Sequence, residues 1–186
     1  MFLANLFRRR DYADAAYALY GAAVARAREP VFYRDFGVPD TLEGRFEMIS
    51  CHVFLILRRL KGESPAPDEG GLAQAVFDLM FADMDRNLRE MGVGDLGVGR
   101  RVKAMAQALY GRIRAYEDGL AGGEDALAQA IQRNVFNDPA GAPGVAARAL
   151  ARDMAASAAA LAALPSPALA KGEASFAPLP GAAVVS

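Results

Sequence analysis

The sequence predicts an all-α protein, a single-domain bundle of five to six helices with a disordered C-terminal tail. Apolar residues recur along most of the chain with a period of about 3.6 residues, and no stretch alternates convincingly as a strand would. Clusters of proline and glycine divide this pattern into segments of helical length. We therefore expect a helical domain at residues 1–164 and a disordered, proline- and alanine-rich tail at residues 165–186.

The first helix is expected at about residues 11–28. Its inward face would carry Ala15, Ala16, Leu19, Tyr20, Ala23, Val24 and Ala27. Pro30 should end it, because proline has no backbone N–H to continue the helical hydrogen bonds. Tyr33 and Arg34 lie in the aromatic connector that follows, which we expect to close one end of the bundle.

The second helix is expected to begin after Asp40 and to run to about Leu60. Asp40 and Glu43 have the spacing of a capping box, in which two side chains satisfy the first backbone N–H groups of a helix. Its main apolar seam consists of Leu42, Phe46, Ile49, Val53, Ile56, Leu57 and Leu60. Met48, Phe54 and Leu55 fall outside that seam. A helix that is apolar on more than one side is typical of the centre of a bundle.

The remaining helices follow a loop with the composition KGESPAPDEGG. They are expected at about residues 72–91, 98–116, 124–136 and 145–164. The clearest stripe belongs to the second of these four: Val98, Val102, Met105, Leu109, Tyr110, Ile113 and Tyr116. The last contains 11 alanines between Val145 and Ala163 and should dock weakly, because alanine buries little apolar area.

Composition argues against several classes of function. A formal net charge of −1 provides no overall field for nucleic acid, so we expect no sequence-specific nucleic-acid partner. Cys51 is the single cysteine and His52 the single histidine, and adjacent helical residues point to different sides. They are expected to be a packed cysteine and a half-exposed histidine. We therefore predict no catalytic residues, no metal, no cofactor and no enzymatic activity.

One motif could suggest a dinucleotide site. Residues 92–97 match G-x-G-x-x-G, but that fingerprint works at a turn from a strand into a helix. Here a helix precedes the glycines, so we interpret Gly92 as a helix C-cap and the motif as a tight turn between two helices.

Asp83 is the most unusual charged residue in the pattern. It follows Leu79 by four positions and Met80 by three, which places a carboxylate within an apolar stripe. Either it forms a structural ion pair or cap, or it contacts a partner in a binding groove. Asp85, by contrast, has the spacing of an exposed i,i+4 pair with Arg89.

A basic face is predicted on the helix that follows the glycine turn. Its members are Arg100, Arg101, Lys103, Arg112 and Arg114, with no acid between Arg100 and Arg114. It is either a solvated face or a docking surface for an acidic partner, ribosomal RNA or a membrane. The absence of interleaved aromatic residues weakens the RNA interpretation.

Two segments resemble the ubiquinol–cytochrome c chaperone family: FYRDFGVPDTLEGRFEMISCHVFLILRRLK and FADMDRNLREMGVGDLGVGRRVKAMAQALYGRIRAY. The runs Asp-Met-Asp-Arg, Arg-Glu-Met-Gly-Val-Gly-Asp and Ala-Leu-Tyr-Gly-Arg are the most specific parts. The resemblance covers about residues 33–136, and Gly97 and Gly99 depart from the family pattern.

The resemblance implies a non-enzymatic assembly factor for the cytochrome bc1 complex of the respiratory chain. Such a protein would bind newly made cytochrome b or other bc1 assembly intermediates, together with a small partner protein and near the ribosome exit. A bacterial member would act in the cytoplasm or peripherally at the cytoplasmic face of the inner membrane. The N-terminal MFLANLFRRR lacks the order of charges and apolar residues of a secretory signal, which agrees with that location.

The residues predicted to bind the partner come from both charged clusters and the aromatic connector. They are Asp83, Asp85, Arg86, Arg101 and Lys103, followed by Tyr33 and Arg34. The alternative function is a basic-faced helical module that docks on a ribosome or membrane surface without a dedicated client.

Overall fold

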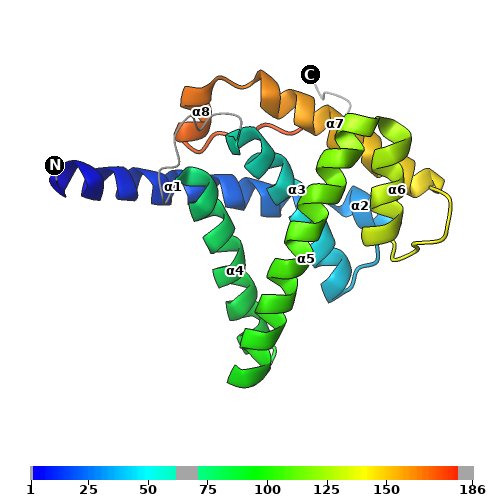
Figure 1. Ribbon diagram of the computed structural model, residues 1–186, viewed down its shortest axis with the longest axis horizontal. Helices are drawn as coiled ribbons and strands as arrows, with labels where there is room; N and C mark the ends of the chain where they lie inside the picture. Colours follow the sequence, from blue (N-terminus) through cyan, green and yellow to red (C-terminus); the bar gives the residue numbers. More distant parts are fainter. Residues whose placement is uncertain (1, 62–70, 180–186) are drawn as a thin grey trace.

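The computed structural model describes residues 2–61 and 71–179, with side chains from residue 12 onward. This part of the chain contains helices and no strand, as the sequence predicts (Figure 1). The helices are α1 (Phe2–Ala27), α2 (Pro30–Arg34), α3 (Leu42–Lys61), α4 (Leu72–Glu90), α5 (Asp95–Gly122), α6 (Glu124–Asn134), α7 (Val145–Ala163) and α8 (Ser166–Ala170). The six longer helices correspond to the six predicted ones, whereas α2 and α8 are too short to leave a periodic pattern.

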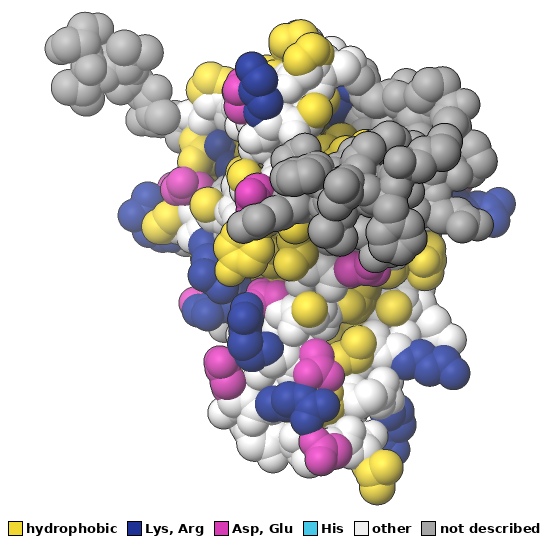
Figure 2. All heavy atoms as spheres, turned by 90° about the vertical axis from the view of Figure 1, so that its left-hand side faces the viewer, with side chains coloured by type: hydrophobic (Ala, Val, Ile, Leu, Met, Phe, Trp, Pro, Cys, Tyr) yellow, Lys and Arg dark blue, Asp and Glu magenta, His cyan; other side chains and the backbone are white. Residues whose placement is uncertain are grey.

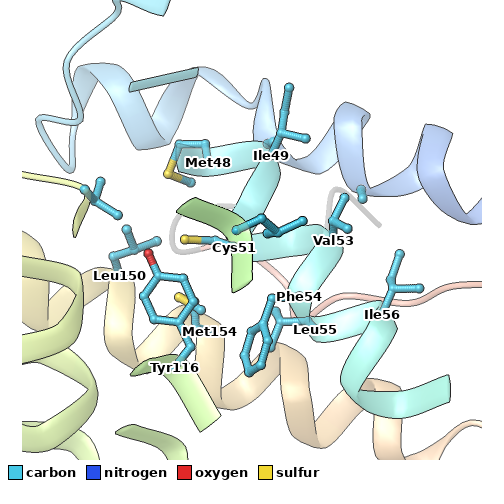
Figure 3. Close-up of a cluster of buried hydrophobic side chains, with 14 of the residues drawn as sticks. Met48, Ile49, Cys51, Val53, Phe54, Leu55, Ile56, Tyr116, Leu150 and Met154 are labelled. Atoms are coloured by element: carbon cyan, nitrogen blue, oxygen red, sulfur yellow. The ribbon is translucent and has the colours of Figure 1, made fainter. Parts of the chain in front are cut away.

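Helix α3 lies at the centre of the bundle, as its apolar sides predict. It contacts α1, α4, α5 and α7, and the run Met48–Ile56 is buried throughout. Figure 3 shows side chains of α5 and α7 meeting this run, with the ring of Tyr116 beside that of Phe54. The centroids of these two rings are 5.6 Å apart.

The N-terminal region differs from the prediction in two ways. Helix α1 begins at Phe2, well before the expected start near residue 11, and ends at Ala27. Pro30 begins the short helix α2 instead of only terminating α1. A proline suits the first position of a helix, where its missing N–H would have had no helical acceptor.

Thr41, not Asp40, caps α3. The backbone N–H of Gly44 donates to Thr41 Oγ1 at 3.1 Å, while Asp40 accepts a hydrogen bond from Arg45 Nε at 2.6 Å. Both residues are common N-caps, and the position of the first helical turn selects the threonine. The predicted capping box with Glu43 is therefore wrong by one residue.

The glycine motif forms the turn between α4 and α5, as predicted. Gly92 has φ of 82° and its N–H donates to Arg89 O at 2.9 Å, while the N–H of Val93 donates to Leu88 O at 3.0 Å. These two bonds define a Schellman C-cap. Helix α5 then begins at Asp95, three residues before the predicted start, and continues to Gly122.

The α4–α5 hairpin projects from one end of the molecule. In Figure 1 its turn lies at the lower end, away from α7 and α8. The upper part of α5 packs on α6, where Gly119 allows the backbone of Leu127 to approach closely.

Helix α7 is an integral part of the core, although the sequence predicts weak docking. Leu150, Met154 and Leu161 are fully buried, and α7 packs on α3 and α6. The alanines reduce the area that each residue buries, but their small size lets neighbouring helices approach closely.

The packed chain continues beyond residue 164, where the sequence predicts disorder. Leu169 of α8 is buried, and the N–H of Ala177 donates to Ser157 Oγ at 3.1 Å. Gly172, with φ of 84°, fits against Ala15 and Ala18 of α1, where a Cβ atom would clash. Residues 180–186 of the expected tail, and most of the loop after Lys61, lie outside the described residues.

Candidate functional site

An apolar groove runs between α3 and α5 and encloses about 410 Å³. Its apolar lining consists of Leu42, Phe46, Leu88, Ala104, Met105 and Ala108, and its charged lining of Glu43, Glu47, Arg101 and Arg112. Phe46 and Leu88 are buried, whereas the side chain of Leu42 is 39% exposed at the edge. The groove therefore offers an apolar floor with charged residues of both signs at its margins.

The groove exists because α5 crosses α3 and continues toward the hairpin turn (Figure 1). Beyond the crossing, α5 packs against α4. Met105 is only partly buried there, at the margin of the core. A methionine at such a position can adapt to differently shaped apolar ligands.

An ion pair between Glu47 of α3 and Arg112 of α5 forms one end of the groove. Arg112 Nε donates to Glu47 Oε2 at 2.6 Å, and Arg112 Nη2 donates to the other carboxylate oxygen. The side chains of Glu47 and Arg112 are 8% and 20% exposed. Burial raises the pKa of the Glu47 carboxyl, and the opposing effect of the Arg112 guanidinium only partly offsets this.

A second hollow of about 360 Å³ lies on the other side of this ion pair. Pro39, Thr41 and Gly44 line it from the start of α3, and Asn134, Val135, Phe136 and Asn137 from the end of α6. Glu43, Glu47 and Arg112 border both hollows. The ion pair thus separates two depressions on one side of the molecule.

Asp83 lies elsewhere, in a smaller hollow between α1 and α4. Tyr20 Oη donates to Asp83 Oδ2 at 2.8 Å, and Arg86 pairs with the same carboxylate. Burial and this hydrogen bond raise the pKa of the Tyr20 hydroxyl. Asp83 therefore forms an ion pair within α4 and a hydrogen bond to α1. These contacts agree with the first of the two interpretations given above, a structural role for this carboxylate.

The other predicted site residues are spread over several places. Asp85 forms the predicted pair with Arg89 at 2.6 Å, and Arg89 also bonds to Asp95 across the turn. Arg101 lines the α3–α5 groove, and Lys103 is exposed on α5. Tyr33 Oη donates to Ala27 O at 2.8 Å, and Arg34 pairs with its exposed neighbour Asp35. Asp83 and Arg86 form an ion pair, but the seven residues predicted to bind a partner do not lie together in one site.

Most of the groove is not predicted from the sequence. Phe46, Met105 and Leu42 appear there only as core residues, and Glu47 is not selected. Glu47 did carry a signal, because an acid between Phe46 and Met48 in a helix that is apolar on several sides needs a buried partner. Arg112, assigned to the basic face, is that partner.

Cys51 and His52 are both buried, so the prediction of a half-exposed histidine is wrong. His52 Nδ1 donates to Met48 O at 2.8 Å, and the rings of Phe32 and Phe176 each lie 5.4 Å from the imidazole. Burial lowers the pKa of His52 to about 4 and raises the pKa of Cys51 to about 12. A neutral thiol enclosed in this way is a packing residue, as predicted.

Two further observations concern the described part of the chain. Within residues 12–61 and 71–179, no group of three His, Cys, Asp or Glu side chains is placed to hold a metal ion. None of the described helices combines the length and apolar character needed to cross a bilayer.

The sequence profile of one protein family, described as Ubiquinol-cytochrome C chaperone, matches residues 34–176. The match extends through α7 and α8, well beyond residue 136, where the resemblance noted from sequence alone ends. It therefore includes the alanine-rich helix and the packed segment that follows it.

Similar proteins bear related names. The chain is 27% identical over 123 residues to "Ubiquinol-cytochrome-c reductase complex assembly factor 1" of Xenopus laevis, covering 66% of this chain and 60% of that protein. It is 29% identical over 107 residues to "Protein CBP3, mitochondrial" of Saccharomyces cerevisiae, covering 56% of this chain and 32% of that protein. The chain thus spans less than two thirds of the length of these relatives.

A solved structure matches over nearly its whole length. The crystal structure of the Cbp3 homolog from Brucella abortus superposes with a TM-score of 0.79 at 41% identity, covering 96% of this chain and 97% of that one.

Proposed function

The chain belongs to the ubiquinol–cytochrome C chaperone family, and on that premise we propose that it is a bc1 assembly factor that holds newly made cytochrome b in the groove between α3 and α5. In this proposal the protein acts by binding and release and catalyses no reaction. Its relatives are named as assembly factors of the ubiquinol–cytochrome c reductase complex, which supports the choice of client.

The apolar floor of the groove is the observation that carries the proposal. Leu42 and Met105 present apolar surface along a cleft that no described helix fills, and the buried side chains of Phe46 and Leu88 lie beneath them. An unassembled membrane protein exposes apolar helices in water, and an amphipathic or apolar helix laid in such a groove is a common mode of recognition. The groove would shield part of that helix until assembly proceeds.

The charged margins would limit how tightly the client is held. Arg101 and Glu43 stand at the sides of the groove, where they remain hydrated and can contact polar residues next to an apolar segment. Contacts of this kind contribute more to specificity and association rate than to affinity. Release to a later assembly step therefore does not have to overcome a buried network of charges.

Leu42→Glu tests the groove directly. Leu42 is the first residue of α3, where an acid is compatible with the helix dipole, so the variant should fold. We expect the cytochrome b recovered with it to fall roughly tenfold, since it loses the contact of one leucine and places a charge in the groove. Val145→Glu is the matched control, because Val145 is an exposed aliphatic residue at the first position of α7. Equal recovery with the two variants would contradict the proposal.

A second candidate function is a docking module for a ribosome or membrane surface without a dedicated client. It is favoured by Arg100, Arg101, Lys103 and Arg114, which are exposed and make no ion pair with a residue in the described ranges. Loss of all partner binding at high salt, with full binding by Leu42→Glu, would favour this function over the chaperone.

A further inference from the structure

We propose that the α4–α5 turn docks on an anionic phospholipid surface, with Leu96 among the acyl chains and Arg100 and Lys103 at the headgroups. This inference goes beyond the proposed groove between α3 and α5 and concerns the start of α5 and a different face of that helix. It identifies how the protein would be held at a membrane.

The turn presents apolar side chains to solvent at the end of a projection. Leu96 is 96% exposed and Met91 is 53% exposed, whereas the other leucines of α4 and α5 are buried or partly buried. Figure 2 shows a hydrophobic side chain at the lowest point of the molecule, at the same end as the hairpin turn in Figure 1. Full exposure of a leucine at an extremity costs solvation free energy, which insertion into lipid would recover.

Two basic residues share a helix face with this leucine. Arg100 and Lys103 follow Leu96 by four and seven positions, and all three are exposed. The face extends over roughly 10 Å at about 1.5 Å per residue. Apolar groups of interfacial proteins are buried about 5–10 Å into the boundary between headgroups and acyl chains, so cations within about 10 Å of an inserted Leu96 can reach the headgroups.

The acidic residues near the turn do not neutralise its positive charge. Residues 85–103 contain five basic and three acidic residues. Arg89 pairs with both Asp85 and Asp95, which leaves Glu90 as the remaining acid near the turn. The exposed cations of α5 are consequently available to anionic headgroups.

A lipid surface fits this end better than nucleic acid or a folded protein. No aromatic residue occurs in residues 82–109, so base stacking, which supports binding of single-stranded nucleic acid, has no platform there. A single protruding leucine bordered by cations offers little area for a stable protein interface, but it suits a bilayer, which needs no matched pocket.

The turn and the client groove can be tested separately. Leu96, Arg100 and Lys103 do not line the groove, whose α5 residues are Arg101, Ala104, Met105, Ala108 and Arg112. A variant of the turn should therefore leave client binding in detergent unchanged, and Leu42→Glu should leave vesicle binding unchanged.

The experiment is co-sedimentation of the full chain with vesicles of phosphatidylcholine alone or mixed with phosphatidylglycerol. We expect binding only to the mixed vesicles, weakening as salt rises. Leu96→Asp should reduce the partition coefficient at least about tenfold. Arg100→Gln and Lys103→Gln should each reduce it about fivefold. Val145→Asp, at an exposed aliphatic residue of α7, is the matched control and should bind like the wild type.

Three results would overturn the proposal. The first is wild-type protein that remains in the supernatant with the mixed vesicles. The second is an equal loss of binding for Leu96→Asp and Val145→Asp. The third is equal sedimentation with both vesicle compositions, since the two cations would then contribute nothing. Circular dichroism of each variant establishes that it is folded before the comparison.

Discussion

Glu47 of α3 and Arg112 of α5 form an ion pair, with 2.6 Å between Glu47 Oε2 and Arg112 Nε, that stands between the α3–α5 groove and the neighbouring hollow. The two residues are 65 positions apart in the sequence, so their pairing fixes the crossing of the two helices. Arg112 Nη1 also donates to Ala108 O at 3.1 Å, which orients the guanidinium along its own helix.

Removing one member of this pair should destabilise the fold. Arg112→Met leaves the Glu47 carboxylate largely buried without its partner, and we expect a loss of about 3 kcal/mol in the free energy of unfolding. Urea denaturation measures it. The double variant Glu47→Met with Arg112→Met should recover most of the loss, because no unpaired charge remains. A single variant as stable as the wild type would show that the pair does not hold the crossing.

Asp83 should matter more than Asp85, for stability and for client capture. Asp83→Ala removes the acceptor of the Tyr20 hydroxyl between α4 and α1, with an expected loss of about 1–2 kcal/mol. Asp85 forms an exposed pair, so Asp85→Ala should change stability by roughly 0.5 kcal/mol or less. The melting temperatures of the two variants, and the amounts of cytochrome b recovered with each, test this prediction.

A double-mutant cycle shows whether the stability lost in Asp83→Ala comes from the hydrogen bond with the Tyr20 hydroxyl. Tyr20→Phe should cost nearly as much as Asp83→Ala, and the two changes together should cost less than their sum. Additive effects would mean that the hydrogen bond contributes nothing. Reduced client recovery by Asp83→Ala at unchanged melting temperature would instead favour a direct contact with the client.

Gly44 and Gly99 should respond in opposite directions to alanine. A Cβ atom on Gly44 would lie 1.9 Å from Pro39 O, so Gly44→Ala must displace the entry into α3. Gly99, inside α5, has no atom within 4 Å of the added Cβ, so Gly99→Ala should stabilise the protein by up to about 1 kcal/mol. The melting temperatures of the two variants check this. A lower melting temperature for Gly99→Ala would show that the added Cβ atom is not accommodated in open space.

His52 should make the fold less stable in acid. Burial lowers its pKa from 6.5 to about 4, so between these values the unfolded chain binds a proton that the folded protein does not. Its stabilising contribution is fully present above about pH 6.5 and is lost as the pH falls through about 4. His52→Leu removes this titration and should flatten the fall in stability across that window. An unchanged pH profile would mean that His52 titrates alike in both states.

The parts of the fold that leave a local trace in the sequence are predictable. The apolar sides of α3 indicate its central place, and Gly92 marks the turn because only a glycine readily adopts its positive φ. The cap of α3 is less certain, since Asp40 and Thr41 are both suitable and the geometry of the first turn decides between them.

Contacts between distant segments leave no such trace. The partner of Glu47 lies on another helix, and periodicity places Arg112 with the exposed cations of α5. Likewise, Gly172 and Phe176 belong to a proline-containing segment with few large apolar side chains, and they pack against residues of α1 and α3 that are distant in the sequence. The α3–α5 groove depends on where α5 crosses α3, which sequence periodicity does not specify.

A crosslinked pull-down of the tagged protein from its own host, with membranes retained and products identified by mass spectrometry, would show whether cytochrome b binds in the α3–α5 groove. A photoreactive residue replaces Met105 in the groove or, as the control, Val145 on α7. If the groove binds the client, cytochrome b will be enriched above other abundant membrane proteins and will be crosslinked from position 105 but not from position 145. Crosslinking of cytochrome b equally from both positions, or its absence from both, would contradict the assignment of the α3–α5 groove as the client site.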